Sequence, residues 1–295
     1  MRRSALAVLL LMSLTACAVS LTACAPGAPP LPSPPPVTGD PSSRAAERQL
    51  LTRAEQTLIA RCLAARGFRY VVRLPPDPPR RFPYVVDDVA WARAHGFGRD
   101  QERRIAAAKA ADPNERWFRR LSPARQRAAL AALNGPRPVG LRARMPGGGM
   151  VAASDEGCTA WAQRRLYGDL PAWFEARLTA ANLTPLYVPR VRAHPAYRKA
   201  VRAWAACMAR RGHPHASPDA LRAALPGVRT PAGERALAVA EAECAAASGL
   251  AATARALDAR YGAEARRAHA GPLATKARLE RAALPRAREV LTGRP

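Results

Sequence analysis

The chain reads Cys-Leu-Ala-Ala-Arg-Gly at residues 62–67 and Cys-Met-Ala-Arg-Arg-Gly at residues 207–212, two copies of the pattern Cys-x-Ala-x-Arg-Gly. Each copy closes a stretch with the apolar spacing of a helix. Glycine is the residue that most readily adopts the left-handed conformation just after a helix. One further cysteine follows each copy, Cys158 after the first and Cys244 after the second. The repeat therefore predicts two halves, each with a cysteine-bearing helix tied to a later segment.

Four cysteines, Cys62, Cys158, Cys207 and Cys244, can pair in three ways. The repeat favours Cys62 with Cys158 and Cys207 with Cys244, because each bond then stays within one half. A body with few aromatic residues and much alanine buries little area per side chain, so such cross-links would stabilise it.

Helical spacing dominates the rest of the chain, beginning with a first helix over Ser43 to Arg66. Residues 139–145 and 150–153 flank Pro-Gly-Gly-Gly at residues 146–149, which indicates a β-hairpin. Phe68 to Arg73 has the composition of a short strand, and Pro285 is expected to kink or restart the last helix. The expected fold is mainly α, a helical body stapled by two disulfides, with a small β-hairpin in the first half.

The N-terminus has the features of an export signal. A basic start, Met1-Arg2-Arg3, precedes a short apolar stretch, and two quartets then read Leu-Thr-Ala-Cys, ending at Cys17 and Cys24. They resemble the bacterial lipoprotein signal, in which the cysteine is diacylated and becomes the mature N-terminus. An ordinary secretory signal or an apolar first helix is the alternative. Cys24 is the favoured anchor, because a proline-rich stretch follows it directly, and Cys17 is almost as good.

These features divide the chain into four parts. Residues 1–23 are expected to be a lipoprotein signal peptide and residues 24–42 a proline-rich tether. Residues 43–187 are expected to form the first helical half with its hairpin, and residues 188–295 the second helical half. Beyond the signal no stretch is long and apolar enough to suggest a membrane span.

The formal net charge is +25, and only three of the 47 basic residues are lysine. Two interpretations stay open. The arginines could contact an anionic partner, or GC-rich coding DNA could have enriched arginine together with alanine, proline and glycine, with ion pairs absorbing many of the charges.

The second copy of the motif and the cysteine after it, Cys207-Met208 through Gly212 and then Cys244, resemble a diffuse set of actinobacterial secreted and lipid-anchored proteins. In these a helix ends in Cys-Met-x-x-x-Gly and a second cysteine follows on a later helix. The first copy has Leu63 in place of methionine. The resemblance covers about a third of the chain and implies a surface location and disulfides. It implies no activity.

The sequence carries weak signals for chemistry. His213-Pro214-His215 is the only histidine cluster, and no cysteine or carboxylate stands at a ligand spacing from it, so no metal site and no cofactor are expected. A glycosidase-type enzyme needs two convergent carboxylates, one with a raised pKa. The acidic pairs available for that are Asp87-Asp88, Asp155-Glu156 and Glu241/Glu243.

The expected protein is a cell-envelope lipoprotein with a non-catalytic binding or structural role. It would be anchored to the outer face of the cytoplasmic membrane through its N-terminal lipid, and it would contact anionic membrane or wall polymer. The alternative is a cell-wall hydrolase built on an unrecognised carboxylate pair. Nucleic acid is not an expected partner, since export argues against it and no binding motif supports it.

Overall fold

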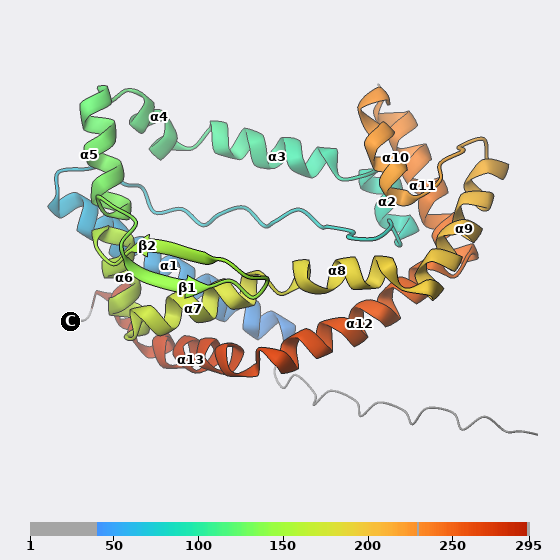
Figure 1. Cartoon of the computed structure of the whole chain (residues 1–295). Coiled ribbons are helices and arrows are strands. Elements are labelled where there is room, and N and C mark those ends of the chain that lie inside the picture. The colour runs from blue at the N-terminus through green and yellow to red at the C-terminus, as the bar shows by residue number, and fades with distance from the viewer. Residues whose placement is uncertain (1–39, 229, 294–295) are drawn as a thin grey trace, which may run out of the picture. The chain divides into compact units, whose positions relative to one another are not determined.

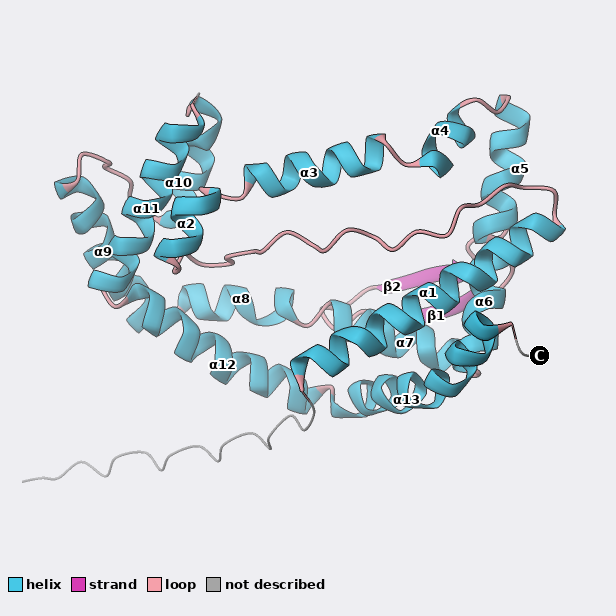
Figure 2. Cartoon of the chain, turned by 180° about the vertical axis from the view of Figure 1, so that it is seen from behind, coloured by secondary structure: helices cyan, strands magenta, loops and turns pink. Residues whose placement is uncertain are grey.

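Figure 1 and Figure 2 show the computed structural model, which describes residues 40–228 and 230–293. The expected signal peptide, its candidate lipidation sites Cys17 and Cys24, and nearly all of the expected tether lie outside the described residues. The described part is mainly α-helical, with one two-stranded antiparallel sheet, as the sequence predicts.

Most elements follow one another with short connections, but a long segment without regular structure joins α1 to α2. Those of the first part are α1 (Pro41–Ala65), α2 (Val89–His95), α3 (Arg99–Ala110), α4 (Pro113–Arg119), α5 (Pro123–Asn134), β1 (Gly140–Arg144), β2 (Met150–Ser154), α6 (Gly157–Tyr167) and α7 (Leu170–Ala181). Those of the second part are α8 (Thr184–Ala193), α9 (Pro195–Arg210), α10 (Pro218–Ala224), a 3-10 turn (Leu225–Gly227), α11 (Pro231–Ala247), α12 (Leu250–Ala268) and α13 (Ala270–Thr292).

The two copies of the repeated motif end their helices with the same geometry. Gly67 and Gly212 have φ values of 74° and 78°, in the left-handed region. After α1 the amide of Phe68 donates to the carbonyl of Leu63 at 2.9 Å, and after α9 the amide of His213 donates to the carbonyl of Met208 at the same distance. Each glycine amide also donates to the carbonyl three residues earlier. The glycines are therefore required by backbone conformation, and the repeat is structural.

Both disulfides join the cysteines that the repeat favours. Cys62–Cys158 ties α1 to α6, with Cα atoms 5.5 Å apart, and Cys207–Cys244 ties α9 to α11, with Cα atoms 5.6 Å apart. The two bonds close loops of very different length, with sequence separations of 96 and 37 residues. Cys158 and Cys244 are fully buried, so each bond is anchored in a hydrophobic cluster.

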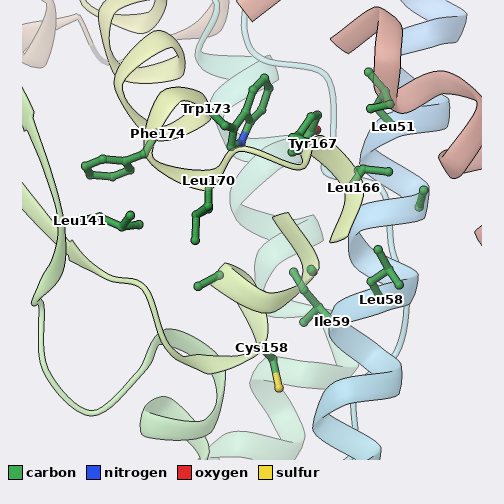
Figure 3. Close-up of a cluster of buried hydrophobic side chains, with 14 of the residues drawn as sticks. Leu51, Leu58, Ile59, Leu141, Cys158, Leu166, Tyr167, Leu170, Trp173 and Phe174 are labelled. Carbon is green, nitrogen blue, oxygen red and sulfur yellow. The ribbon is translucent and has the colours of Figure 1, made fainter. Parts of the chain in front are cut away.

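The first cluster gathers around Cys158 and contains side chains from α1, β1, α6 and α7 (Figure 3). Leu58 and Ile59 of α1 lie near α6, and Trp173 of α7 stacks on Tyr167 with ring centroids 3.6 Å apart. The last helix, α13, belongs to the same cluster through Leu279, Ala283 and Ala287. The last helix therefore packs on the first described helix, α1.

The second cluster contains side chains from α8, α9, α11 and α12, centred on the fully buried Trp204 and Met208. Residues from much earlier in the sequence join it, namely Tyr84 and Val85, and α2 packs directly on α11. The clusters therefore do not follow the boundary expected at residue 187. Tyr84 and Val85 belong to the second cluster, Val86 and two residues of α2 form a small third cluster with α11, and α13 belongs to the first cluster.

The segment before α2 differs from the sequence expectation. Phe68 to Arg73 is extended but forms no strand. The side-chain amide of Asn114, at the start of α4, takes the place of a partner strand at Val71: it accepts from the Val71 amide at 2.8 Å and donates to the Val71 carbonyl at 2.9 Å. The extended stretch continues through the proline-rich residues 74–79 and runs alongside α3 (Figures 1 and 2).

Two further expectations have clear outcomes. The hairpin forms as predicted, with Gly140 opposite Ser154 and Arg144 opposite Met150. Pro285 does not restart the last helix, because α13 continues through it to Thr292.

Within the described residues, no helix taken singly has both the length and the apolar character needed to cross a bilayer. One bent pair, α11 with α12, passes such a test only when the two helices are taken together, and they meet at 74°.

Removal of either disulfide should lower the free energy of unfolding by several kcal/mol. In the loop-entropy account, the double variant Cys207→Ala/Cys244→Ala should lose about 4 kcal/mol of unfolding free energy, and Cys62→Ala/Cys158→Ala about 5 kcal/mol. Denaturant unfolding of each variant against the oxidised protein measures the loss. Losses below about 1 kcal/mol in both variants would show that the bonds do not constrain the unfolded chain as the loop-entropy account requires.

Candidate functional site

A pocket of about 510 Å³ opens beside the second cluster. Apolar side chains form part of its wall, among them Phe82, Phe97, Val188 and Leu225. Its charged lining consists of Glu102 and five arginines, which are Arg80, Arg81, Arg99, Arg192 and Arg222. We call this recess the arginine pocket.

Four different parts of the chain bring these arginines together. Arg192 lies in the last turn of α8, and Arg222 lies in α10 next to Leu221, which is fully buried and fixes that helix. Arg80 and Arg81 end the proline-rich stretch, while Arg99 starts α3 directly after Gly98. Gly98 has a φ of 92°, and a Cβ there would lie 3.2 Å from the Trp91 ring, so the turn that presents Arg99 requires glycine.

Two of the arginines hold the backbone that forms one wall of the pocket. Arg222 donates to the carbonyls of Phe82 at 3.0 Å and Tyr84 at 3.3 Å, and Arg192 donates to the carbonyl of Pro83 at 2.7 Å. Three consecutive carbonyls of a segment without strand pairing are thereby satisfied. A guanidinium has five N–H groups, so these bonds leave donors over. The Nε of Arg192 is buried and has no hydrogen-bond partner.

Glu234 of α11 organises the turn between α2 and α3. Its carboxylate accepts from the Phe97 amide at 3.1 Å and lies 3.6 Å from a terminal nitrogen of Arg99. Arg99 in turn donates to the carbonyls of Leu225 at 2.6 Å and Val228 at 3.3 Å. Glu234 is buried but paired, so its role is structural.

Glu241 lies seven residues after Glu234, on the same face of α11, and has a different environment. Its side chain is fully buried, and the nearest cation is Arg222, with 3.9 Å between a guanidinium nitrogen and a carboxylate oxygen. Neither carboxylate oxygen has a hydrogen bond of normal geometry. Burial raises the pKa of Glu241 to about 8, although Arg222 and the nearby amide of Val86 act in the opposite direction.

The charge balance of the pocket depends on this carboxyl group. Four other carboxylates face the five arginines: Asp88 lies 2.7 Å from Arg80, Asp219 lies 3.1 Å from Arg192 and 3.7 Å from Arg222, Glu234 pairs with Arg99, and Glu102 lies in the wall. The pocket therefore has one excess positive charge while Glu241 is protonated, and none when Glu241 is ionised.

Arg81 is the cation most available to a ligand. It is exposed and forms no hydrogen bond or ion pair with any part of the chain that the structure describes. Arg80, its neighbour, is engaged: its guanidinium lies 4.7 Å from the centre of the Phe82 ring. The Trp91 amide and Arg80 both bond to Asp88, and they hold the pKa of Asp88 below its usual value.

Two of the acidic pairs that the sequence suggests, Asp87-Asp88 and Glu241/Glu243, have side chains engaged in different places. The third pair, Asp155-Glu156, lies in the turn between β2 and α6 and does not line the arginine pocket. Glu243 lies on another side of α11 from Glu241 and forms ion pairs with Arg211 and Arg93. Asp87 pairs with Arg255 at 2.6 Å, while Asp88 caps α2. The residue that reasoning from sequence missed is Glu234, seven positions before Glu241. A spacing of seven residues places both carboxylates on one face of a helix, so the sequence could have indicated that they lie close together.

Among residues 40–228 and 230–293, no group of three or more histidine, cysteine, aspartate or glutamate side chains is placed to hold a metal ion, His213 and His215 included. Comparison with protein-family models, curated proteins and solved structures finds nothing that matches this chain. The arrangement of the arginine pocket is therefore the main guide to function.

The arginines as a group do two kinds of structural work. Within the described residues nine of them form ion pairs with carboxylates. Others donate to main-chain carbonyls of distant elements, as Arg61 does to Val290 and Arg286 to Leu166. Arg99, Arg192 and Arg222 do both, and all three line the arginine pocket.

The variant Glu241→Gln should be more stable than the native protein at alkaline pH. The pKa of Glu241 in the folded state lies above the usual glutamate value of about 4.5. The folded state therefore binds more protons than the unfolded state, and it loses stability as pH rises from about 4.5 to about 8. The advantage of the amide should therefore grow with pH, by at most about 1.4 kcal/mol per pH unit. Denaturant unfolding across this range measures it, with Glu243→Gln as the control. An advantage that is the same at every pH would contradict the buried, protonated carboxyl.

Proposed function

We propose that this protein is a lipid-anchored protein of the cell envelope that binds an anionic component of the membrane surface or wall without catalysing a reaction. The arginine pocket is the observation that carries the proposal. It combines apolar walls with guanidinium groups, which suit phosphate and carboxylate ligands because they donate in a planar fork.

Two observations support the proposed cellular location. The two disulfides are compatible with an extracytoplasmic location, because such bonds persist in oxidising compartments. The lipid anchor rests on the two Leu-Thr-Ala-Cys quartets ending at Cys17 and Cys24. A tether followed by a basic body would keep the arginines close to an acidic surface.

A hydrolase is supported less well. A general acid needs a raised pKa, which Glu241 has, but it also needs to reach the bond that breaks. Glu241 is fully buried. Glu243, the second carboxylate that a hydrolase would need, lies on another side of the helix and forms ion pairs with arginines. The binding experiment below therefore also measures whether the protein hydrolyses wall material.

Lipidation is tested on the mature protein. It should partition into detergent and carry a diacylglyceryl mass on Cys24 or on Cys17, because each ends a lipobox-like quartet. Intact-mass and N-terminal peptide measurements decide between the two sites. A water-soluble mature form with an unmodified N-terminus, or a retained signal, would remove the anchor from the proposal.

Binding is tested with the full chain carrying Cys17→Ser and Cys24→Ser, so that no acyl group contributes. Sedimentation with phosphatidylglycerol vesicles should show binding that weakens steeply between low and physiological salt, because arginine contacts to anionic groups are screened. The variant Arg81→Gln should bind about 5-fold more weakly, since one basic residue near an anionic surface contributes about 1 kcal/mol.

Arg278→Gln is the matched control, because Arg278 is also exposed and lies on α13, which packs on the first cluster. It should change binding less than Arg81→Gln. Phosphatidylcholine vesicles give the uncharged baseline, and purified wall material is incubated in parallel. Binding that is independent of salt and of Arg81 would reject the proposal, and release of soluble wall fragments would replace it with the hydrolase.

A further inference from the structure

The arginine pocket has the size and composition of a site for a small organic anion. Its volume of about 510 Å³ falls in the range of small-molecule sites, and exceeds what a bare phosphate or carboxylate would fill. Phe82, Phe97, Val188 and Leu225 supply apolar contact area beside the arginines. A ligand with an apolar body and one acidic group would therefore use both parts of the wall.

Glu241 gives this pocket a second property. Arg222 lies between the pocket and the buried carboxyl, so an anion in the pocket and an ionised Glu241 would compete for the same guanidinium. The two negative charges also repel each other, and the low dielectric of the interior strengthens that repulsion. Only a protonated Glu241 leaves the pocket with its excess positive charge.

We propose that the arginine pocket binds an organic phosphate or carboxylate with an apolar body, and that Glu241 holds a proton while the anion is bound. The inference rests on the proposed function, since it specifies which site takes the anion and what kind of molecule carries it. When Glu241 is ionised beforehand, it takes up one proton from solvent as the ligand enters. No covalent bond changes.

The surroundings of Glu241 leave few other groups to set its protonation. From α10, Arg222 favours the ionised form and Asp219 disfavours it. From α9, the indole N–H of Trp204 donates to the main-chain carbonyl of Glu241 at 3.3 Å and does not reach its carboxyl group. The titratable side chain that α9 contributes here is Tyr197. The segment before α2 and α2 itself present apolar side chains to this part of α11: Val86 from the segment, and Trp91 and Ala92 from α2, form a small buried cluster with Ala238 and Ala242.

The two arginines that clamp the backbone of residues 82–84 keep donors for a ligand. Arg222 and Arg192 use only part of their five N–H groups on the carbonyls of residues 82–84. Arg81, an exposed lining residue, adds a guanidinium that forms no hydrogen bond or ion pair within the described chain. A preformed set of donors lowers the ordering cost of binding.

The test is calorimetric titration of the full chain, carrying Cys17→Ser and Cys24→Ser, with phenyl phosphate and separately with inorganic phosphate. Phenyl phosphate should bind more tightly, because it also fills the apolar wall. Its affinity for the native protein should fall by up to about ten-fold per pH unit above the pKa of Glu241, where phenyl phosphate is already a dianion and its own charge no longer changes. Titration at about pH 8 in two buffers of different ionisation enthalpy should show proton uptake.

The variants separate the carboxyl from the pocket. Glu241→Gln should keep its affinity at alkaline pH and show no proton uptake, because the amide is neutral throughout. Glu243→Gln removes a carboxylate from the same helix outside the pocket and should follow the native pH profile. Arg81→Gln should weaken binding at every pH while leaving the proton uptake of the remaining binding unchanged.

The outcomes also distinguish this inference from the proposed function. A pH profile that Glu241→Gln does not alter would overturn the proton linkage, and failure of phenyl phosphate to bind at about pH 6 would overturn the ligand assignment. If vesicles bind but phenyl phosphate does not, only the inference on the pocket falls. If phenyl phosphate binds with proton uptake but anionic vesicles and wall material do not, the pocket stands and the proposed envelope function falls.

Discussion

Arginine side chains that donate to main-chain carbonyls hold together parts of this protein that have no regular partner. Residues 82–84 form no strand, yet Arg192 and Arg222 satisfy three consecutive carbonyls there. The segment is thereby fixed against α8 and α10, which creates one wall of the arginine pocket. If these bonds were lost, the backbone polar groups would be left unpaired and the pocket would lose its shape.

The parts of the fold that the sequence predicted are those set by local chemistry. The helix ends at Gly67 and Gly212 follow from glycine's freedom at positive φ, and the repeat then led to the correct cysteine pairs. The assignment of elements to clusters could not be read in the same way. That α13 packs on α1 depends on long-range burial of small residues such as Ala283 and Ala287, which carry no local signal. The strand expected at residues 68–73 was wrong because a side chain, Asn114, provides the pairing there.

The candidate site was only partly visible before the structure. Arginine is so frequent in this chain that composition could not show which guanidinium groups meet. The structure also adds a role that neither interpretation of the charge included, because many arginines cross-link elements through carbonyls. Glu241 was among the acidic pairs considered, but its partner was taken to be Glu243, and burial rather than a second carboxylate raises its pKa. A structural clamp and an anion site are compatible in one pocket, since guanidinium groups have donors for both.

The protonation state of Glu241 connects the fold to the proposed site, and it can be observed directly. A ¹³C NMR titration of the glutamate side-chain carboxyls, with Glu241→Gln used for assignment, follows that state as pH changes. The account predicts a Glu241 carboxyl that is protonated at neutral pH and titrates near 8, with a still higher midpoint when phenyl phosphate is present. A carboxyl that is ionised at neutral pH, or whose midpoint does not move with the ligand, would contradict the account.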